Sequence, residues 1–151
     1  MKACPVHAYA MTLEGIRPED EAELWAASMS LPLPVMLRGL KLSTDTWVGL
    51  ADGVPFCMVG VAPYSLIGSK GVPWMVGTVQ LDRHAKAFLK ACRPVLETIL
   101  RQFSTLENWV DARNTKAIRW LRWMGFQVED PQPHGALGLP FCHFVMRRDH
   151  V

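Results

Sequence analysis

The sequence contains little that is typical of secreted, fibrous or membrane-spanning proteins. Its four cysteines lie far apart, mostly within apolar runs, so no disulfide framework is indicated and we expect buried thiols. The eleven glycines and eleven prolines follow no period, which excludes collagen-like and low-complexity chains. The longest uncharged stretch, 53–69, is interrupted by proline and glycine and is too short to span a bilayer. Because no apolar signal core follows Lys2, we expect a soluble protein of a reducing compartment.

Candidates for a metal site are equally few. Cys4 and His7 stand at a spacing typical of metal ligands, but no second pair of ligands follows them in the sequence. We therefore expect no metal.

The length and composition are those of one folded domain, which we expect to span residues 1–151. Half of the residues are hydrophobic and 20% are charged, a balance that excludes intrinsic disorder. A chain of this length buries about 68–70% of its unfolded surface. Six tryptophans and six phenylalanines supply large side chains for the resulting core.

Charge is unevenly distributed, although the net charge of +2 is too small to indicate nucleic-acid binding by itself. Residues 1–30 carry two cations against five acids, whereas residues 79–124 carry nine cations against four acids. A basic second half attracts phosphate groups, from a cofactor or from a nucleic acid. The tryptophans and arginines of 119–123 could stack on nucleobases. Partly buried rings and solvated arginines are the simpler interpretation, so nucleic acid is not the expected partner.

The first forty residues are predicted to hold one strand and two helices. Residues 3–11 are apolar and partly β-favouring, which favours a strand. A helix is expected to begin at Pro18, because proline suits the first helical position and acids follow it. Pro32 and Pro34 are expected to end that helix, and 35–42 to form a second, shorter one.

Three strands are predicted next. The runs 46–51 and 54–62 are rich in β-branched and aromatic residues and flank Asp52-Gly53, which predicts a hairpin with a type I′ turn. A further strand is expected over 72–78, after a turn at 68–71.

The clearest periodicity lies in the second half. Apolar residues recur at helical spacing over 82–103, which predicts an amphipathic helix kinked at Pro94. A strand is expected over 108–112 and a second helix over 115–124.

The ends of that second helix carry specific signals. Asn114 is a suitable N-cap. Gly125 is placed to end the helix in a left-handed conformation, with Phe126 packing back on Leu121 as in a Schellman motif. Strands are predicted over 126–128 and 141–146, and the proline- and glycine-rich residues between them are expected to form a mobile or binding loop.

This order of elements resembles the GCN5-related N-acetyltransferase (GNAT) fold. The segment 108–126 (NWVDARNTKAIRWLRWMGF) is similar to the family's strand, asparagine, helix, glycine and aromatic residue. The residues on the family's positions are Asn114, Ala117, Ile118, Gly125 and Phe126. The resemblance implies an α/β fold with an open mixed sheet of about seven strands, flanked by about four helices. It also implies that the sheet splays between its fourth and fifth strands, where acetyl-CoA lies.

A narrower resemblance concerns phage proteins. The pattern LENWV followed by NTxxIRWLR resembles a phage subgroup of this fold, which includes the internal virion proteins of short-tailed, T7-like phages. The similarity covers residues 74–126. It implies a location in the host cytoplasm or the phage virion, with phage or host proteins as partners.

The family's phosphate-binding turn reads Gln/Arg-x-x-Gly-x-Gly/Ala and is matched by QLDRHA, in which Gln80 and Ala85 fit. Arg83 replaces the central glycine, so it either fills the phosphate site or supplies a charge-assisted bond to phosphate. The residues that the resemblance implies for contact with acetyl-CoA are Val76, Gly77, Thr78, Gln80, Arg83, His84, Ala85 and Asn114. Asn114 is equally a helix N-cap, and Gly77 and Thr78 are equally the end of a strand.

The resemblance is weakest at the catalytic positions. Many family members carry a tyrosine as general acid where this chain has Leu121, and the matching fourth strand, WMVGT, contains no glutamate to act as base. The substitutes that the sequence offers are Asp111, Glu129, His143 and His134. Asp111 is also expected to assist the following helix, and His143 to lie in the core or on a sheet face.

The sequence therefore supports two functions almost equally. One is an acetyl-CoA-dependent N-acetyltransferase acting on a protein or small amine, with CoA and the amine as partners. The other is a catalytically inactive internal virion or host-interaction protein that keeps the fold. Leu121 and Arg83 favour the second, whereas Asn114, Gln80 and Ala85 favour the first. A nucleic-acid-binding module is a third, weaker alternative.

Overall fold

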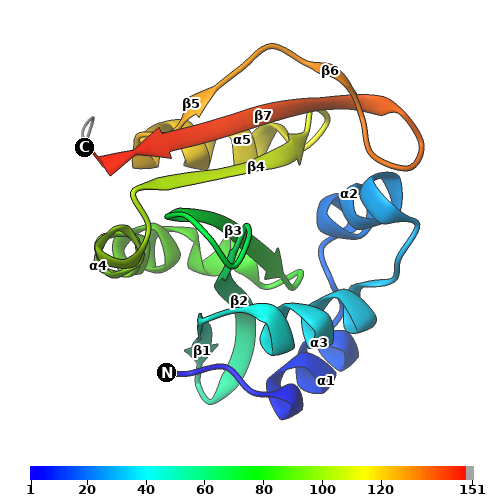
Figure 1. Cartoon of the computed structure of the whole chain (residues 1–151). Coiled ribbons are helices and arrows are strands. Elements are labelled where there is room, and N and C mark those ends of the chain that lie inside the picture. Colours follow the sequence, from blue (N-terminus) through cyan, green and yellow to red (C-terminus); the bar gives the residue numbers. More distant parts are fainter. Residues whose placement is uncertain (149–151) are drawn as a thin grey trace.

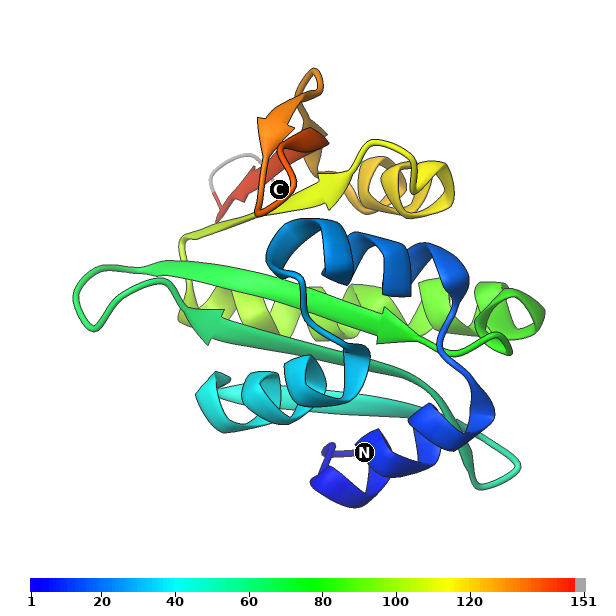
Figure 2. The ribbon, with the colours of Figure 1, turned by 90° about the vertical axis from the view of Figure 1, so that its right-hand side faces the viewer.

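An open, mixed sheet of seven strands forms the centre of the protein, with α-helices on both faces (Figures 1 and 2). The structure is a computed structural model that describes residues 1–148. The helices in this range are α1 (Pro5–Glu14), α2 (Pro18–Ser28), α3 (Pro32–Leu42), the short 3-10 helix η1 (Leu81–His84), α4 (Ala85–Gln102) and α5 (Thr115–Met124). The strands are β1 (Asp45–Ala51), β2 (Val54–Pro63), β3 (Lys70–Gly77), β4 (Thr105–Asp111), β5 (Gln127–Val128), β6 (Gln132–His134) and β7 (Leu139–Arg147).

The sheet has one interruption, between β3 and β4. The strand order is β1-β2-β3-β4-β7-β5, and β6 pairs with β7. Every pairing is antiparallel except that of β3 with β4, which is parallel and joins Lys70 to Thr105 and Gly71 to Leu106. Beyond these two pairs the strands separate. The predicted open mixed sheet of about seven strands is confirmed, and the splay lies between the third and fourth strands.

The helices cover the two faces unequally. α1, α2 and α3 lie on one face, and α4 and α5 on the other (Figure 2). The buried cluster beneath α4 and α5 includes Ile99, Leu106, Ile118, Phe126 and Phe144. The cluster beneath α1 and α3 includes Met11, Met36 and Met58. Because burial of each such side chain stabilises the fold by about 1.5–3 kcal/mol, both layers are held firmly against the sheet.

Residues 3–11, predicted to be a strand, belong largely to helix α1. Pro5 occupies its first turn, where the missing N–H has no partner to lose. Cys4 and His7 form a capping box, in which the Cys4 backbone N–H donates to His7 Nδ1 at 3.1 Å. The ligand-like spacing of these two residues is therefore explained by helix capping.

Burial explains why the helix is favoured there. Ala8 and Met11 are both fully buried, and this one-turn spacing fits a helix rather than the alternation of a strand. Extended pairing at this end is limited to a bridge between Lys2 and Trp47. Five α-helices are present among residues 1–148 where about four were expected, so the predicted element order is wrong at its start.

Two predicted turns are confirmed by their backbone angles. Asp52 and Gly53 have φ values of 52° and 78°, as a type I′ turn requires. Gly125 ends α5 with φ 106°, and the Phe126 N–H donates to the Leu121 carbonyl at 3.0 Å, as in a Schellman motif.

Two helix boundaries differ from those predicted. α3 begins at Pro32 rather than Val35, because this proline starts a helix instead of ending the previous one. α2 ends at Ser28 and is capped by Met29, which adopts a left-handed conformation with φ 53°. The helix predicted over 82–103 consists of η1 followed by α4. None of the helices within 1–148 combines the length and apolar character that crossing a membrane requires.

The loop predicted over 129–140 contains β6 and a turn that packs against α2. The Ala136 N–H donates to the Ala27 carbonyl at 2.9 Å, and the Leu137 N–H to the Ala26 carbonyl at 3.2 Å. These bonds satisfy carbonyl groups at the C-terminal end of α2. The turn therefore fixes one end of the helix that lies over the separation of β3 and β4.

Candidate functional site

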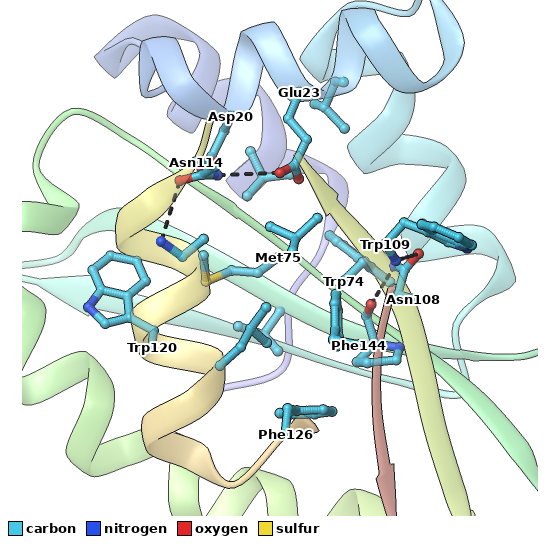
Figure 3. Close-up of a pocket in the computed structure, with 18 of the residues that line it drawn as sticks. Asp20, Glu23, Trp74, Met75, Asn108, Trp109, Asn114, Trp120, Phe126 and Phe144 are labelled. Carbon is cyan, nitrogen blue, oxygen red and sulfur yellow. Dashed lines mark hydrogen bonds between the residues drawn. The ribbon is translucent and has the colours of Figure 1, made fainter. Parts of the chain in front are cut away.

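A cavity of about 400 Å³ occupies the separation between β3 and β4 (Figure 3). Its walls include Trp74 and Met75 of β3, Asn108 and Trp109 of β4, and residues of α2 and α3 on one face and α4 and α5 on the other. Most of these side chains are apolar or aromatic. The cavity therefore connects the two faces of the sheet at the point where the backbone ladder is missing.

Asn108 bridges the two strands at the narrow end of the cavity. Its Nδ2 donates to the Pro73 carbonyl on β3 at 2.8 Å, and its Oδ1 accepts the Trp109 backbone N–H at 2.8 Å. One side chain thus satisfies two backbone groups that lose their partners where the strands separate.

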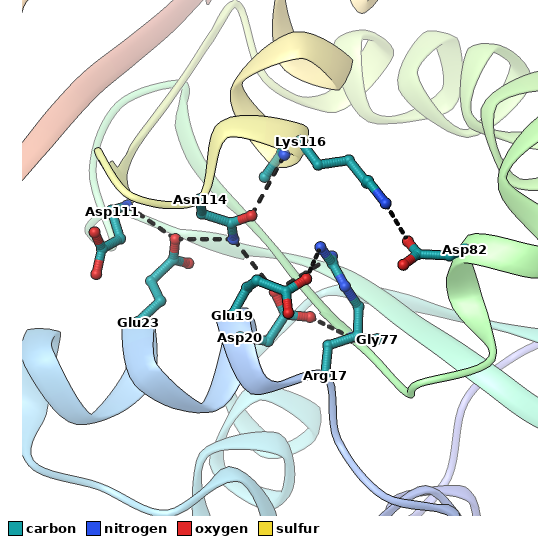
Figure 4. A network of polar contacts seen from close by, with 10 residues as sticks. Arg17, Glu19, Asp20, Glu23, Gly77, Asp82, Asp111, Asn114 and Lys116 are labelled. Atoms are coloured by element: carbon teal, nitrogen blue, oxygen red, sulfur yellow. Dashed lines mark hydrogen bonds and ion pairs between the residues drawn. The ribbon is translucent and has the colours of Figure 1, made fainter.

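Two carboxylates of α2 close the wide end. Asp20 Oδ2 accepts the Gly77 N–H on β3 at 2.8 Å, and Glu23 Oε1 accepts the Asp111 N–H on β4 at 2.8 Å (Figure 4). The Asn114 Nδ2 lies 3.4 Å from both Asp20 Oδ1 and Glu23 Oε1. Because Asp20 and Glu23 are three residues apart, they share one face of the helix and hold one strand each.

Of the β3 residues whose backbone groups face the gap without a ladder partner on β4, two are bonded to other parts of the chain. The Thr78 N–H donates to β2, so the alternate residues Pro73, Met75 and Gly77 direct their backbone groups toward β4. The Pro73 carbonyl is bonded to Asn108, and the Gly77 N–H and carbonyl to α2 and its N-cap. Within residues 1–148, Met75 has no ladder partner on β4, since pairing stops at Gly71.

Burial sets the protonation of the two α2 acids. Burial raises the pKa of Glu23 to about 7, against the lowering effect of the Asp111 N–H. Burial also raises the pKa of Asp20, opposed chiefly by the guanidinium of Arg17. Glu23 therefore binds a proton at a higher pH than an exposed glutamate does.

Arg17 is a buried cation beside this cluster. Its side chain is 2% exposed and donates to Glu19 at 2.8 Å and to Asp20 at 3.5 Å. The guanidinium lies 5.2 Å from the centre of the Trp120 ring, within the range of a cation–π interaction. Arg17 thus places a positive charge beside the two carboxylates of α2.

The predicted phosphate-binding turn is closed on itself. The Leu81 N–H donates to the Thr78 carbonyl at 3.0 Å and the Arg83 N–H to the Gln80 carbonyl at 3.1 Å. Asp82 forms an ion pair with Lys116 of α5 at 2.9 Å (Figure 4). The two backbone bonds occupy N–H groups that an open turn would offer to a phosphate.

The predicted cofactor contacts fall into two groups. Val76 and Asn114 line the cavity, whereas Gly77, Thr78 and the residues of the turn do not. The turn residues in question are Gln80, Arg83, His84 and Ala85. A Cβ at position 77 would approach Leu81 Cδ2 to 2.5 Å, so glycine is required there for packing.

Asn114 has the structural role that its position predicted. Its Oδ1 accepts the Ala117 N–H at 3.4 Å, which confirms the N-cap. Its two amide hydrogens are directed at the α2 carboxylates. Asn114 therefore joins the start of α5 to the clamp on the strands.

Among the predicted catalytic residues, Asp111 does not line the cavity. Its side chain is 2% exposed and receives bonds from the Arg113 guanidinium, at 2.6 Å between Nη2 and Oδ2, and from the Arg113 N–H at 2.9 Å. This arrangement fits the alternative interpretation, in which Asp111 organises the turn before α5.

His143 and Glu129 also lie outside the cavity, in a chain of polar side chains on the sheet. Glu129 Oε1 lies 2.7 Å from His143 Nδ1, and Glu107 Oε2 lies 3.3 Å from His143 Nε2. Lys70 completes the chain with a 2.8 Å contact to Glu107. Of the predicted candidates, His134 does line the cavity, stacked on Trp109 with ring centres 3.9 Å apart.

Sequence reasoning did not identify Asp20 and Glu23 as site residues. Their acidic run follows Pro18 and was explained by the positive end of the helix dipole. Their three-residue spacing is a signal that places both side chains on one face of a helix. Nothing local to the sequence indicated that this face would meet the separated strands.

Solved structures of acetyltransferases share this fold. A ribosomal-protein-alanine N-acetyltransferase from Brucella melitensis matches with a TM-score of 0.73 and 14% identity, over 97% of this chain and 98% of that one. A GNAT-family acetyltransferase from Streptococcus pneumoniae matches with a TM-score of 0.67 and 15% identity, over 97% of each chain. An aminoglycoside acetyltransferase in complex with coenzyme A matches with a TM-score of 0.68 and 14% identity, over 99% of this chain and 94% of that one.

No protein-family model and no curated protein sequence matches the chain. At these identities the structural likeness establishes the fold. The chain has the α/β fold of the GNAT acetyltransferases, with an open mixed sheet of about seven strands.

Proposed function

We propose that the protein is an acetyl-CoA-dependent N-acetyltransferase acting on a small amine or a protein amine. The observation that carries the proposal is the cavity between β3 and β4, which is lined by side chains from both faces of the sheet. Such a cavity lets an acyl donor from the α4–α5 side meet an amine from the α2–α3 side, and this proximity accelerates a bimolecular transfer. The coenzyme A complex of the aminoglycoside acetyltransferase with the same fold supports the donor.

The residues of the gap fit acetyl-CoA at its acyl and pantetheine end. The Met75 N–H and carbonyl face the gap without a ladder partner on β4. The extended pantetheine arm, which contains amide groups, can form hydrogen bonds to such a free strand edge. When bound, the thioester supplies an activated acyl carbon. In this position the Met75 N–H would polarise the acyl carbonyl and stabilise negative charge developing on its oxygen.

The phosphate end fits less well, because the turn at 80–85 is bonded to itself. Arg83 is the proposed charged contact to phosphate, and the neighbouring Lys116 is held by Asp82. Leu121 lines the cavity where a tyrosine would supply a proton. A thiol has an ordinary pKa of about 8.5, so the sulfur can leave as thiolate and take its proton from water.

Calorimetry with acetyl-CoA, followed by an assay of CoA release in the presence of amines, tests the proposal. Binding at micromolar concentrations together with amine-dependent release is the expected result. Failure of acetyl-CoA to bind would reject the enzyme.

The second candidate is a non-catalytic internal virion or host-interaction protein of a phage. It is favoured by Leu121 and by the closed turn, in which Asp82 holds Lys116. The resemblance of residues 74–126 to internal virion proteins motivates it. Mass spectrometry of purified particles would detect the chain under this alternative, and measurable CoA release would argue against it.

A further inference from the structure

We propose that the amine side of the cavity takes a primary ammonium group carried on a compact apolar or aromatic body, with Glu23 as the residue that binds this group and accepts its proton. The inference rests on the proposed acetyltransferase function and names its acceptor class. It follows from the carboxylate, the aromatic walls and the small number of unengaged polar groups in one cavity.

The carboxylate of Glu23 is held in place by one of its two oxygens. Oε1 accepts the Asp111 N–H at 2.8 Å and lies 3.4 Å from Asn114 Nδ2. Among residues 1–148, both hydrogen bonds to this carboxylate fall on Oε1, and Glu23 lines the cavity (Figure 3). An ammonium group entering the cavity therefore meets an oriented anion with one free oxygen.

Asp20 differs from Glu23 in this respect. Both of its oxygens have partners, since Oδ2 accepts the Gly77 N–H and Oδ1 lies near Arg17 and Asn114. Its charge is thus already compensated by a buried guanidinium. Glu23 is the α2 acid that remains to receive a ligand.

Two indole rings form fixed walls of the cavity. Trp74 donates from Nε1 to Ser43 Oγ at 2.7 Å, and its ring lies so close to Gly39 and Gly60 that a Cβ at either would come within 2.7 Å. Trp109 is held by the parallel stack with His134. Rings fixed in this way can contact an apolar body without loss of side-chain freedom, and can attract a cation to their faces.

The remaining polar groups of the cavity are largely engaged. Asn108 and Asn114 both use their amide groups to bond the backbone. Arg38 lines the cavity but is exposed, so its charge can stay in water. A polyamine or an aminoglycoside would bring several polar groups into a lining that offers few partners, and each unpaired group would weaken binding. An apolar monoamine avoids this penalty.

The proton balance of the transfer follows from this placement. The amine binds as an ammonium beside the Glu23 carboxylate and gives one proton to Glu23 on the way to transfer, because desolvation lowers the cost of forming the neutral pair. The nitrogen lone pair then forms the N–C bond to the acyl carbon, and the C–S bond breaks with its electrons on sulfur. A second nitrogen proton passes to water, which protonates the thiolate, and the third stays on the amide. Glu23 returns its proton to solvent.

The test measures amine binding without acetyl-CoA, by calorimetry at pH 8. The probes are 2-phenylethylamine, the uncharged 2-phenylethanol of nearly equal shape, and the polar 1,4-diaminobutane. A charge-assisted bond is worth roughly 10- to 100-fold, so we expect 2-phenylethylamine to bind about 10-fold or more tightly than each other probe. Equal binding of 2-phenylethylamine and 2-phenylethanol to the unaltered protein would overturn the inference, whatever the variants do.

The matched variants are Glu23→Gln and Glu21→Gln, because Glu21 is an exposed acid on the same helix. Glu23→Gln should abolish the preference for the amine over the alcohol, and Glu21→Gln should keep it. A preference that survives in a folded Glu23→Gln protein would also overturn the assignment of Glu23.

Failure of this inference is distinguishable from failure of the proposed function. CoA release with 1,4-diaminobutane but not with 2-phenylethylamine would reject the acceptor class and keep the acetyltransferase. Amine binding that depends on Glu23, in a protein that does not bind acetyl-CoA, would reject the acetyltransferase and keep the amine site.

Discussion

The Glu23 carboxylate of α2 accepts the backbone N–H of Asp111 on β4, with 2.8 Å between Oε1 and the nitrogen. The side chain thus supplies the hydrogen-bond acceptor that a neighbouring strand would otherwise supply. Asp20 does the same for Gly77 on β3. One helix therefore completes both edges of the gap, and the residue proposed to bind the amine also belongs to the framework.

Glu23→Gln is expected to change how stability depends on pH. The pKa of Glu23 is about 7 in the folded protein and near 4.5 when unfolded, so between these values the folded chain binds more protons. The favourable contribution is complete below pH 4.5 and is lost as the pH rises through 7. The amide variant cannot ionise, yet its oxygen can still accept the Asp111 N–H. We expect the variant to be more stable than the original protein at pH 8.5, by on the order of 3 kcal/mol, and equal to it near pH 4.

Thermal unfolding across this pH range provides the measurement, with Glu21→Gln as the control that should follow the original protein. Other charges near Glu23 are those of Asp20, Asp111 and Arg113, which are present in all three proteins. A Glu23→Gln protein with a lower Tm at pH 8.5 would contradict the assigned pKa.

Gly125→Val is expected to destabilise the fold strongly. Gly125 has φ 106°, which a β-branched residue adopts only with strain of roughly 1–3 kcal/mol, and a Cβ would also lie 3.4 Å from Met146 Cε. Gly125→Asn is the matched comparison, because asparagine tolerates the left-handed region better. Urea unfolding should rank the original protein above the Asn variant and the Asn variant above the Val variant. An unchanged midpoint for Gly125→Val would refute the argument.

Arg83→Ala is expected to weaken acetyl-CoA binding by about 1.5–3 kcal/mol if Arg83 bonds phosphate from the turn. Arg101→Ala, at the far end of α4, should leave the affinity unchanged. Calorimetry measures the acetyl-CoA affinity of the original protein and of the two variants. Tighter binding by Arg83→Gly would instead mean that the arginine fills the phosphate site.

Under the proposed function, Met75→Pro is expected to slow acyl transfer while leaving the protein folded. Proline is tolerated where a strand N–H has no ladder partner, and the Met75 N–H faces the gap. Loss of a single donor to an oxyanion lowers kcat by about 10²–10³-fold. The control is Met75→Leu, which keeps the N–H and should stay active. Activity near that of the original protein in a folded Met75→Pro variant would exclude this N–H from catalysis.

The parts of the fold that sequence predicted correctly are those that local rules determine. Asn114 and Gly125 bound α5 because capping depends on neighbours a few residues away. The Asp52-Gly53 turn follows from backbone preference alone. By contrast, the strand predicted over residues 3–11 was wrong, because their β-favouring composition was outweighed by the burial of Ala8 and Met11 on one face of a helix.

The site was less predictable because its parts come together only through tertiary packing. Glu23 and Asp111 are 88 residues apart in the chain, and no local pattern joins them. Asp111 and His143 were reasonable candidates by chemistry, but each is turned toward its own hydrogen-bond partners outside the cavity. The resemblance to the GNAT fold predicted the gap, and the sequence of α2 alone did not reveal what fills its wide end.

The two-pair ladder between β3 and β4 leaves the width of the gap to side chains. Asn108 sets the distance between the strands at one end, and Asp20 and Glu23 set it at the other. The length of the acyl chain that the gap accepts can thus be changed at position 108 alone, without a change to the sheet. A smaller residue in place of Asn108 would lengthen the slot toward Gly71, and under the proposed function longer acyl thioesters would then compete with acetyl-CoA as donors.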